Sequence, residues 1–376
     1  MDLSDLETPA LVVDLARMQR NLDRAADYAR EHRLALRPHI KTHKSPLLGR
    51  EQLERGAVGL TCATPLEAEV MADVCDDLLV MYPPVGARRA TRLAALAKRV
   101  RVTVALDSDA AAADFSRALV AAGARARVLI EIDAGMHRVG VQSAADAAAL
   151  GARVAKMPGL DVVGLAFYPG HIRAPVGEHD AQLAELERVV GEARAAFSQA
   201  GLRTDVVSAG STPTIWETHE VAGVTEMRPG TYIYNDRTTA QIGACTLDDC
   251  ALTVLATVVS TAVPGQAVID AGSKALGREP MRGAAADGFG CLLEHPDVIV
   301  ASMSEEHGIL DLSGTSWRPR VGDRVRVIPN HVCIVVHLAD VVYGMRDGVV
   351  ETSWPVAARG RGQPVLDDAS EPVTRR

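Results

Sequence analysis

The chain has 376 residues, of which 48% are hydrophobic, 3% aromatic and 23% charged, and its formal net charge is −8. This length suits two ordinary domains or one large barrel with a smaller unit. The acidic balance argues against nucleic acid or an anionic membrane as a partner, because a phosphate polymer attracts a basic surface.

The first two thirds of the chain alternates short apolar segments with segments of helical period. The apolar segments are nearly continuous, which is typical of parallel strands covered on both faces. We expect strands at residues 34–38, 58–63, 76–83, 100–106, 127–133, 162–168, 205–210 and 225–230. Helices are expected at 16–31, 65–74, 87–98, 109–122, 143–156 and 178–200. This order predicts an α/β fold with a (β/α)₈ TIM-type barrel over residues 12–240, with a doubly wound open sheet as the alternative.

The texture changes at about residue 245, where strand-like segments separated by Gly, Pro and Asp turns replace the helical ones. They include "LTVLATVVSTAV", "QAVIDAGS", "DRVRVIP" and "HVCIVVHLADVVYGM". We expect residues 245–357, completed by residues 1–11 and their "TPALVVDL" segment, to form a β-rich domain. Residues 358–376, rich in Arg, Asp and Pro, are expected to be a poorly ordered tail.

Several features predict a cytoplasmic protein. No apolar run is long enough to span a membrane, and the acidic N-terminus lacks the pattern of a signal peptide. The six cysteines have no framework spacing, which indicates reduced thiols. Cys245 and Cys250 are too oddly spaced for a common zinc site and are interpreted as structural thiols.

Unusual polar residues follow the predicted strands, at the edge where barrel enzymes place their chemistry. Lys41 follows the first strand, Arg138 the fifth and Tyr168 the sixth. Gly with Ser and Thr ends the seventh and eighth strands, in "SAGSTPT" and "RPGTYIYND". Backbone amides and hydroxyls in such loops suit a phosphate group.

The segment "RPHIKTHK" at 37–44 holds two of the chain's five lysines, although 35 of the 40 basic residues are arginine. A partly desolvated lysine can lose its proton and attack a carbonyl, whereas arginine stays protonated. With a phosphate site and an arginine nearby, the pattern favours pyridoxal 5'-phosphate held as a Schiff base. The alternative is that Lys41 and Lys44 are solvated loop charges.

Seven motifs together resemble the D-threonine aldolase/D-serine dehydratase family of fold-type III pyridoxal phosphate enzymes, which have an alanine-racemase-like barrel. They are "LRPHIKTHK", "EIDAGMHRVGV", "VSAGSTPT", "EMRPGTYIYND", "DAGSKALGRE", "SEEHG" and "PNHVC". The resemblance implies that Lys41 carries the cofactor, Tyr168 lies near its ring and Arg138 near its phenolic oxygen. It also implies a phosphate site made of Ser211, Thr212, Gly230 and Thr231, with Tyr232 beside them.

The "PNHVC" segment predicts a metal site. Alternate residues of a strand share a face, so His331 and Cys333 should converge. Imidazole with thiolate favours Zn²⁺, although Mn²⁺ or another divalent ion is an alternative, and such a pair also occurs as plain core packing. The resemblance implies the zinc site, because the dehydratase branch uses His and Cys here. Two protein ligands would leave positions open for water and substrate.

The expected function is therefore that of a pyridoxal phosphate- and zinc-dependent lyase on D-3-hydroxy amino acids. We favour a dehydratase of D-serine or D-threo-3-hydroxyaspartate type, which gives a 2-oxo acid and ammonia. A metal-dependent D-threonine aldolase giving glycine and an aldehyde is the alternative, and a non-catalytic pyridoxal phosphate-binding protein is a remoter one. The expected partners are a small D-amino acid substrate and, as is common in the family, a second copy of the chain in a homodimer.

Overall fold

Eight parallel strands form a barrel in the first part of the chain. The computed structural model describes residues 1–281, 288–360 and 362. The sheet order is β2-β9-β8-β7-β6-β5-β4-β3. The amide of Ile40 donates to the Thr61 carbonyl (2.9 Å) and the Thr61 amide to the Pro38 carbonyl (2.8 Å), which joins the two edges of the sheet. The strands are β2 (Ala35–Leu36), β3 (Leu60–Cys62), β4 (Asp77–Val80), β5 (Arg101–Leu106), β6 (Ala126–Glu131), β7 (Leu160–Ala166), β8 (Val206–Ala209) and β9 (Glu226–Met227).

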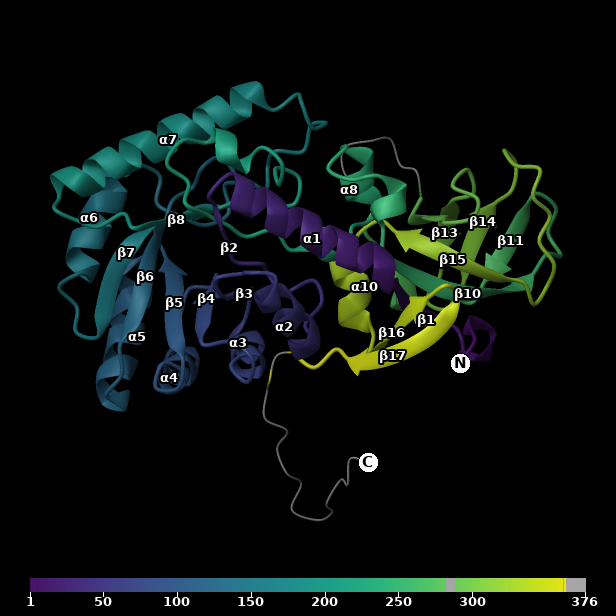
Figure 1. Ribbon diagram of the computed structural model, residues 1–376, viewed down its shortest axis with the longest axis horizontal. Helices are drawn as coiled ribbons and strands as arrows, with labels where there is room; N and C mark the ends of the chain where they lie inside the picture. Colours follow the sequence, from purple (N-terminus) through teal and green to yellow (C-terminus); the bar gives the residue numbers. More distant parts are fainter. Residues whose placement is uncertain (282–287, 361, 363–376) are drawn as a thin grey trace, which may run out of the picture.

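Helices cover the outside of this barrel (Figure 1). Several begin at a capping side chain: the hydroxyls of Thr64, Ser108 and Ser143 each accept a hydrogen bond from an amide in the first turn. The apolar faces of these helices pack on the strands in a core that includes Phe115 and Phe197, both fully buried. These helices are α1 (Leu15–Glu31), α2 (Pro46–Glu54), α3 (Pro65–Met71), α4 (Ala87–Leu96), α5 (Asp109–Ala122), α6 (Ala144–Val154) and α7 (Asp180–Gln199). A further short helix, α8 (Arg237–Gln241), lies in the other half of the molecule (Figure 1).

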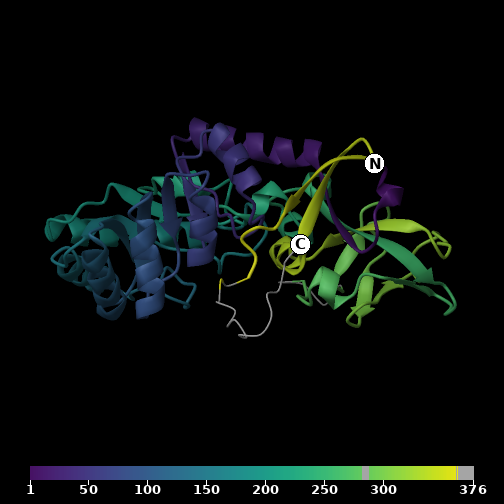
Figure 2. The same cartoon turned by 90° about the horizontal axis from the view of Figure 1, so that it is seen from below.

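A second, mixed sheet forms the other lobe of the molecule (Figures 1 and 2). Its strands are β1 (Ala10–Asp14), β10 (Leu252–Ser260), β11 (Gln266–Ile269), β12 (Gly290–Leu292), β13 (Val300–Met303), β14 (Gly308–Asp311), β15 (Arg324–Pro329), β16 (Val341–Arg346) and β17 (Val349–Pro355). The N-terminal β1 lies inside the sheet, antiparallel to β10 and parallel to β16. Two short helices, α9 (Ser273–Leu276) and α10 (Val332–Leu338), pack beside it. Single 3₁₀ turns occur at Leu3–Asp5, Thr218–Glu220, Thr231–Ile233 and Leu247–Asp249.

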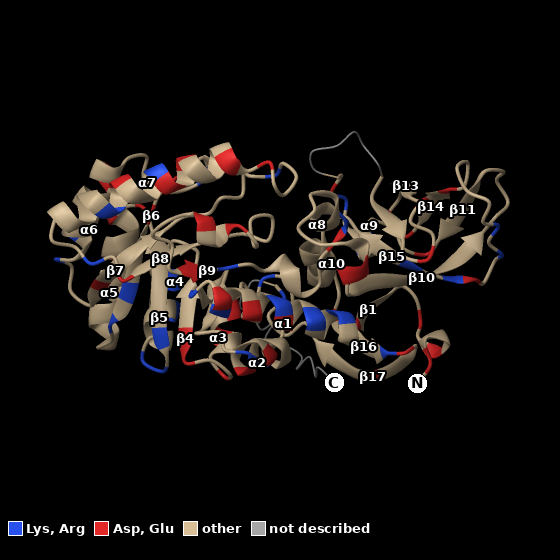
Figure 3. Cartoon of the chain, turned by 45° about the horizontal axis from the view of Figure 1, so that its top comes forward, with Lys and Arg blue, Asp and Glu red and all other residues tan. Residues whose placement is uncertain are grey.

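The two lobes meet along α1, which contacts both β2 of the barrel and β16 of the second sheet (Figure 1). Figure 3 shows that charged residues lie mainly on outer helices and loops, whereas the barrel strands are largely uncharged. None of the helices in the described part of the chain has the length and apolarity needed to cross a bilayer.

The α/β barrel with a β-rich second domain agrees with the sequence prediction, and all eight predicted barrel strands are present. One predicted strand is wrong, because residues 332–338 form α10 rather than part of a strand. Ala358, at the start of the predicted tail, is fully buried, and its amide donates to the Lys44 carbonyl (3.0 Å). Most of that predicted tail, residues 361 and 363–376, lies outside the described residues.

Candidate active site

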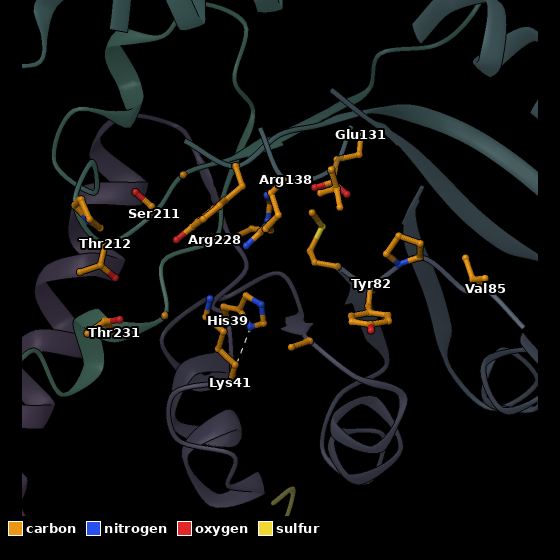
Figure 4. A pocket seen from close by; sticks show the side chains of 18 of the residues that line it. His39, Lys41, Tyr82, Val85, Glu131, Arg138, Ser211, Thr212, Arg228 and Thr231 are labelled. Atoms are coloured by element: carbon orange, nitrogen blue, oxygen red, sulfur yellow. Dashed lines mark hydrogen bonds between the residues drawn. The ribbon is translucent and has the colours of Figure 1, made fainter. Parts of the chain in front are cut away.

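A cavity of about 610 Å³ opens at the carboxyl ends of the barrel strands (Figure 4). Its lining brings together seven residues expected from the sequence: Lys41, Arg138, Tyr168, Ser211, Thr212, Gly230 and Thr231. Figure 4 shows Ser211, Thr212 and Thr231 on one side of the cavity and Tyr82 and Val85 on the opposite side. The volume is that of a small-molecule site.

The two lysines of the loop after β2 have different surroundings. Lys41 reaches into the cavity, where its Nζ atom lies 5.6 Å from the centre of the Tyr168 ring. Lys44 is buried and forms an ion pair with the carboxylate of Glu67. The loop therefore presents a single lysine, Lys41, to the cavity.

The ring of Tyr168 lies close to both Lys41 and Arg138. The guanidinium carbon of Arg138 is 5.0 Å from the centre of the tyrosine ring. Gly170 makes this position possible, since a Cβ atom there would lie 2.1 Å from the ring of Tyr168. The glycine of "YPGH" thus allows the ring to fold back over its own loop and face the lysine.

The wall made of Ser211, Thr212, Gly230 and Thr231 has the properties of an anion site. The Thr212 hydroxyl is buried and has no hydrogen-bond partner in the described part of the chain. A buried polar atom without a partner is costly, so the orphan hydroxyl indicates a group supplied by a ligand. A Cβ atom at Gly230 would lie 3.0 Å from the His39 carbonyl oxygen, which explains the glycine. With Lys41 across the cavity, these residues fit pyridoxal phosphate.

Tyr232 does not line this cavity. It is buried in the core, and its hydroxyl accepts a hydrogen bond from the Gln52 side chain (3.0 Å). Gln52 in turn contacts Nε2 of His43 (3.2 Å), whose Nδ1 accepts from the Ser45 amide (3.1 Å). Burial lowers the pKa of His43 to about 4, so this ring is neutral. The chain of hydrogen bonds holds the lysine loop against the barrel.

Two charged residues in the cavity, Arg228 and Glu131, were not expected from the sequence. The Arg228 guanidinium donates to the Ser208 hydroxyl (2.6 Å) and the Phe167 carbonyl (2.8 Å), and burial lowers its pKa. Burial raises the pKa of Glu131 to about 7, against the opposing effect of Arg228. Both lie at the ends of apolar strands, Glu131 in "EIDAG" and Arg228 in "EMRPG". A charged residue at the end of an apolar strand is the sequence pattern that could have predicted their place in the site.

A second cavity of about 230 Å³ adjoins the first and shares five lining residues with it: Lys41, Arg138, Tyr168, Pro213 and Thr231. His331 and Cys333 line this cavity. The prediction that they converge is correct in outcome but wrong in reason. His331 is the residue preceding α10 and Cys333 lies in its first turn, so a helix start rather than a strand brings them together.

The surroundings of His331 and Cys333 fit a metal site. Nδ1 of His331 lies 2.5 Å from a Glu279 carboxylate oxygen, which leaves its other ring nitrogen for a ligand and orients the ring. Although burial lowers the pKa of His331, contact with Cys333 and with Glu279 raises it to about 11. Burial raises the pKa of the Cys333 thiol. The neighbouring His331 and Lys41 lower this pKa by more than burial raises it, so the pKa lies below the ordinary value of a thiol. The contacts with Cys333 and Glu279 thus favour the protonated form of His331, and the contacts with His331 and Lys41 favour the ionised form of Cys333.

The described residues contain no group of three or more His, Cys, Asp or Glu side chains placed to hold a metal ion. A site on His331 and Cys333 would therefore have two protein ligands, as expected from the sequence, with its other positions facing the cavity. Asp236 also borders this cavity, but its carboxylate accepts from the amides of Thr239 (2.9 Å) and Val332 (3.2 Å). It fixes α8 and the start of α10.

Arg173 is a further unpredicted residue of the smaller cavity. Its Nε donates to the Gly170 carbonyl (2.9 Å), and it makes no ion pair within the described part of the chain. An arginine without a carboxylate partner, in the cavity that His331 and Cys333 also line, suits an anionic group of a ligand.

Comparison with known proteins places this arrangement among enzymes. The alanine racemase N-terminal domain family matches residues 13–238, and the putative serine dehydratase domain family matches residues 251–345. D-threo-3-hydroxyaspartate dehydratase of a Delftia species is 36% identical over 352 residues, which are 88% of this chain and 92% of that protein.

Solved structures of similar enzymes superpose on this chain over almost its whole length. The D-threonine aldolase of Filomicrobium marinum superposes with a TM-score of 0.88 at 35% identity, covering 96% of this chain and 97% of that one. A cysteine-to-alanine mutant of D-threo-3-hydroxyaspartate dehydratase, in the metal-free form, superposes with a TM-score of 0.87 at 32% identity, covering 96% and 100%. An aldolase and a dehydratase are thus about equally similar to this chain.

Proposed function

This chain belongs to the D-threonine aldolase/D-serine dehydratase family of pyridoxal phosphate-dependent lyases, and on that premise we propose that it is a zinc-dependent dehydratase of D-3-hydroxy amino acids. The substrate would be D-serine or D-threo-3-hydroxyaspartate, and the products a 2-oxo acid and ammonia. The observation that carries the proposal is the His331 and Cys333 pair, which lines a cavity shared with Lys41.

Lys41 is the proposed catalytic base. Bound pyridoxal phosphate would supply an electron sink that makes the α-proton of the substrate acidic. The Lys41 amine, at the junction of the two cavities, is placed to take that proton. Lys44 is unsuited to this role because its ammonium group is held by Glu67 away from the cavity.

The other cavity residues bind and orient. Ser211, Thr212 and Thr231 are proposed to donate hydrogen bonds to the phosphate group, with Gly230 giving the backbone room to approach it. Arg138, beside the Tyr168 ring, is proposed to lie near the phenolic oxygen. Arg173 is proposed to receive a carboxylate of the substrate in the smaller cavity.

His331 and Cys333 are proposed to hold Zn²⁺, which would polarise the β-hydroxyl of the substrate as a Lewis acid. A thiolate ligand favours zinc over Mn²⁺, which prefers oxygen donors. We therefore propose that the ion is Zn²⁺ and that it would bind the β-hydroxyl of the substrate. Loss of this hydroxyl is the step that distinguishes dehydration from aldol cleavage. The metal-free form of a related dehydratase mutated at a cysteine supports a metal in this group of enzymes.

Aldol cleavage is the second candidate, and the similarity to a D-threonine aldolase structure favours it. Product analysis separates the two. A dehydratase converts D-serine to pyruvate and ammonia, whereas an aldolase converts D-threonine to glycine and acetaldehyde. If the purified protein with pyridoxal phosphate and Zn²⁺ releases glycine and an aldehyde but no ammonia, the dehydratase proposal is wrong. If it binds the cofactor but turns over neither D-serine, nor D-threonine, nor D-threo-3-hydroxyaspartate, it is a non-catalytic carrier.

A further inference from the structure

Two threonine hydroxyls flank the sulfur of Cys333. Oγ1 of Thr42 lies 3.1 Å from Sγ, and Oγ1 of Thr231 lies 3.7 Å from it. Thr42 is fully buried and directly follows Lys41, whereas Thr231 follows Gly230 at the end of β9. In the part of the chain that the structure describes, neither hydroxyl has another hydrogen-bond partner. The sulfur of the second domain is thus in contact with two separate barrel loops.

The two hydroxyls differ in what else they face. Thr231 lines both cavities, and in the larger one it forms, with Ser211 and Thr212, the wall proposed to hold the phosphate. Thr42 lines neither cavity. A hydroxyl has a single proton to donate. When the sulfur is ionised and accepts, Thr231 has to divide its proton between an anion in the cavity and the Cys333 sulfur, whereas Thr42 has the sulfur as its one partner among the described residues.

The proton of Thr231 matters to the metal. A hydrogen bond donated to a thiolate withdraws charge from the sulfur and makes it a weaker ligand, and such contacts around a ligand tune the affinity of a metal site. A phosphate that draws the Thr231 proton away therefore leaves a more electron-rich sulfur. In the opposite direction, a metal ion withdraws charge from the sulfur, which makes the sulfur a weaker hydrogen-bond acceptor and favours donation from the Thr231 hydroxyl to the phosphate.

We propose that Thr231 couples the two sites, so that pyridoxal phosphate strengthens metal binding and metal strengthens pyridoxal phosphate binding by the same factor. The inference rests on the proposed function, because it needs both groups to bind where we have placed them. Thermodynamic linkage requires the two factors to be equal. One hydrogen bond exchanged between the two acceptors corresponds to a factor of about 3 to 10 in each affinity.

Gly230 keeps the connection short. A Cβ atom at this position would lie 3.1 Å from the Thr42 hydroxyl and 3.0 Å from the His39 carbonyl. Without a side chain at Gly230, the lysine loop and the phosphate loop approach closely enough for both threonines to reach one sulfur. The coupling is thereby built into the loops that also carry Lys41.

The test is a thermodynamic cycle on the full chain. Zn²⁺ affinity is measured by competition with a chromophoric chelator, once on cofactor-free protein and once on pyridoxal phosphate-loaded protein freed of excess cofactor. Pyridoxal phosphate affinity is then measured by absorbance with and without Zn²⁺. We expect Zn²⁺ to bind about 3- to 10-fold more tightly to the loaded protein, with the same factor in the reverse direction. Equal Zn²⁺ affinities for the two forms overturn the inference.

Variants locate the effect. Thr231→Val should remove the coupling and Thr231→Ser should keep it, with Thr231→Ala as a second deletion if thermal unfolding shows that valine does not fit. Thr42→Val is the matched control: it should change Zn²⁺ affinity equally in both forms and leave the coupling intact. Coupling that survives loss of the Thr231 hydroxyl refutes the assignment. If the wild-type chain fails to bind pyridoxal phosphate or Zn²⁺ at all, the proposed function itself fails, which is a different result.

Discussion

Lys44, in the loop after β2, forms an ion pair with Glu67 of α3, and both side chains are almost fully buried. Three residues earlier, Lys41 faces the cavity beside Tyr168. The pair of lysines in "KTHK" is thus divided between a structural and a chemical position. This division can be tested directly.

Borohydride reduction of the pyridoxal phosphate-loaded protein should attach the cofactor to Lys41, as read by peptide mapping. Lys41→Ala and Lys41→Arg should both prevent attachment, because neither side chain offers a primary amine that can lose its proton. Lys44→Met should keep the label on Lys41 but destabilise the fold by about 3–5 kcal/mol, since it leaves Glu67 buried without its partner. A label on Lys44 would reverse the assignment.

Gly230→Val should weaken pyridoxal phosphate binding by at least tenfold. The added side chain would begin 3.0 Å from the His39 carbonyl and 3.1 Å from the Thr42 hydroxyl, so the loop that carries Lys41 must move. Gly191→Val on α7, where a Cβ meets no neighbour, is the control for a general effect of valine. Titration of both variants with the cofactor, followed by absorbance, decides the point. Unchanged affinity in Gly230→Val would remove this loop from the site.

Glu279→Gln should weaken Zn²⁺ binding by about 10- to 100-fold, because the carboxylate that orients His331 becomes a neutral amide. Pyridoxal phosphate binding in saturating Zn²⁺ should change little. Glu306→Gln is a matched control in the same domain, where the glutamate pairs with exposed Lys274. Competition with a chelator measures both variants. Equal Zn²⁺ affinities for the two would show that the Glu279 contact does not serve the metal.

The stability of the cofactor-free chain should depend on the protonation of Glu131. Its pKa of about 7 in the folded chain lies above the ordinary value of 4.5. The contribution is therefore fully present below about pH 4.5 and is lost as the pH rises to about 7, by up to about 3 kcal/mol. Glu131→Gln should flatten this part of the stability profile, as measured by denaturant unfolding at several pH values. An unaltered slope would mean that Glu131 titrates normally.

Arg173→Gln should raise KM for D-threo-3-hydroxyaspartate more than for D-serine if Arg173 receives the second carboxylate. An equal rise for both substrates would place the α-carboxylate there instead. Cofactor and Zn²⁺ binding should not change, because Arg173 makes no hydrogen bond to the loop that carries Lys41 or to His331 and Cys333. Arg188→Gln on the outer helix α7 is the control. No effect on either KM would exclude Arg173 from the site.

The barrel could be predicted from the sequence because its strands are continuous apolar segments and its helices have regular apolar faces. The same local patterns gave a wrong prediction for "HVCIVVHL", because its β-branched residues favour a strand. Here the carboxylate of Asp236 accepts the Val332 amide (3.2 Å) and stabilises the start of a helix. That contact joins residues 96 positions apart, which a local pattern does not contain.

The site residues divide in the same way. Lys41, Arg138 and Tyr168 follow strands, and the barrel brings the ends of its strands together whatever the details of packing. Tyr232 was placed beside the phosphate by its neighbours in sequence, but it turns into the core to meet Gln52. A charge at the end of an apolar strand could have indicated Arg228 and Glu131, whereas Arg173 is identified by the cavity that it lines. Which way a side chain turns in a loop depends on packing from distant segments.

The position of β1 inside the second sheet bears on how the molecule is made. Strand β1 is synthesised before the barrel strands, yet its neighbours β10 and β16 are residues 252–260 and 341–346. All eight barrel strands are synthesised before either neighbour exists, so the barrel has time to form while both edges of β1 are still unpaired. The segments that line the larger cavity also precede His331 and Cys333 in the chain. The second sheet can therefore be completed only after the barrel strands have been made, when β10 and β16 become available to pair with β1.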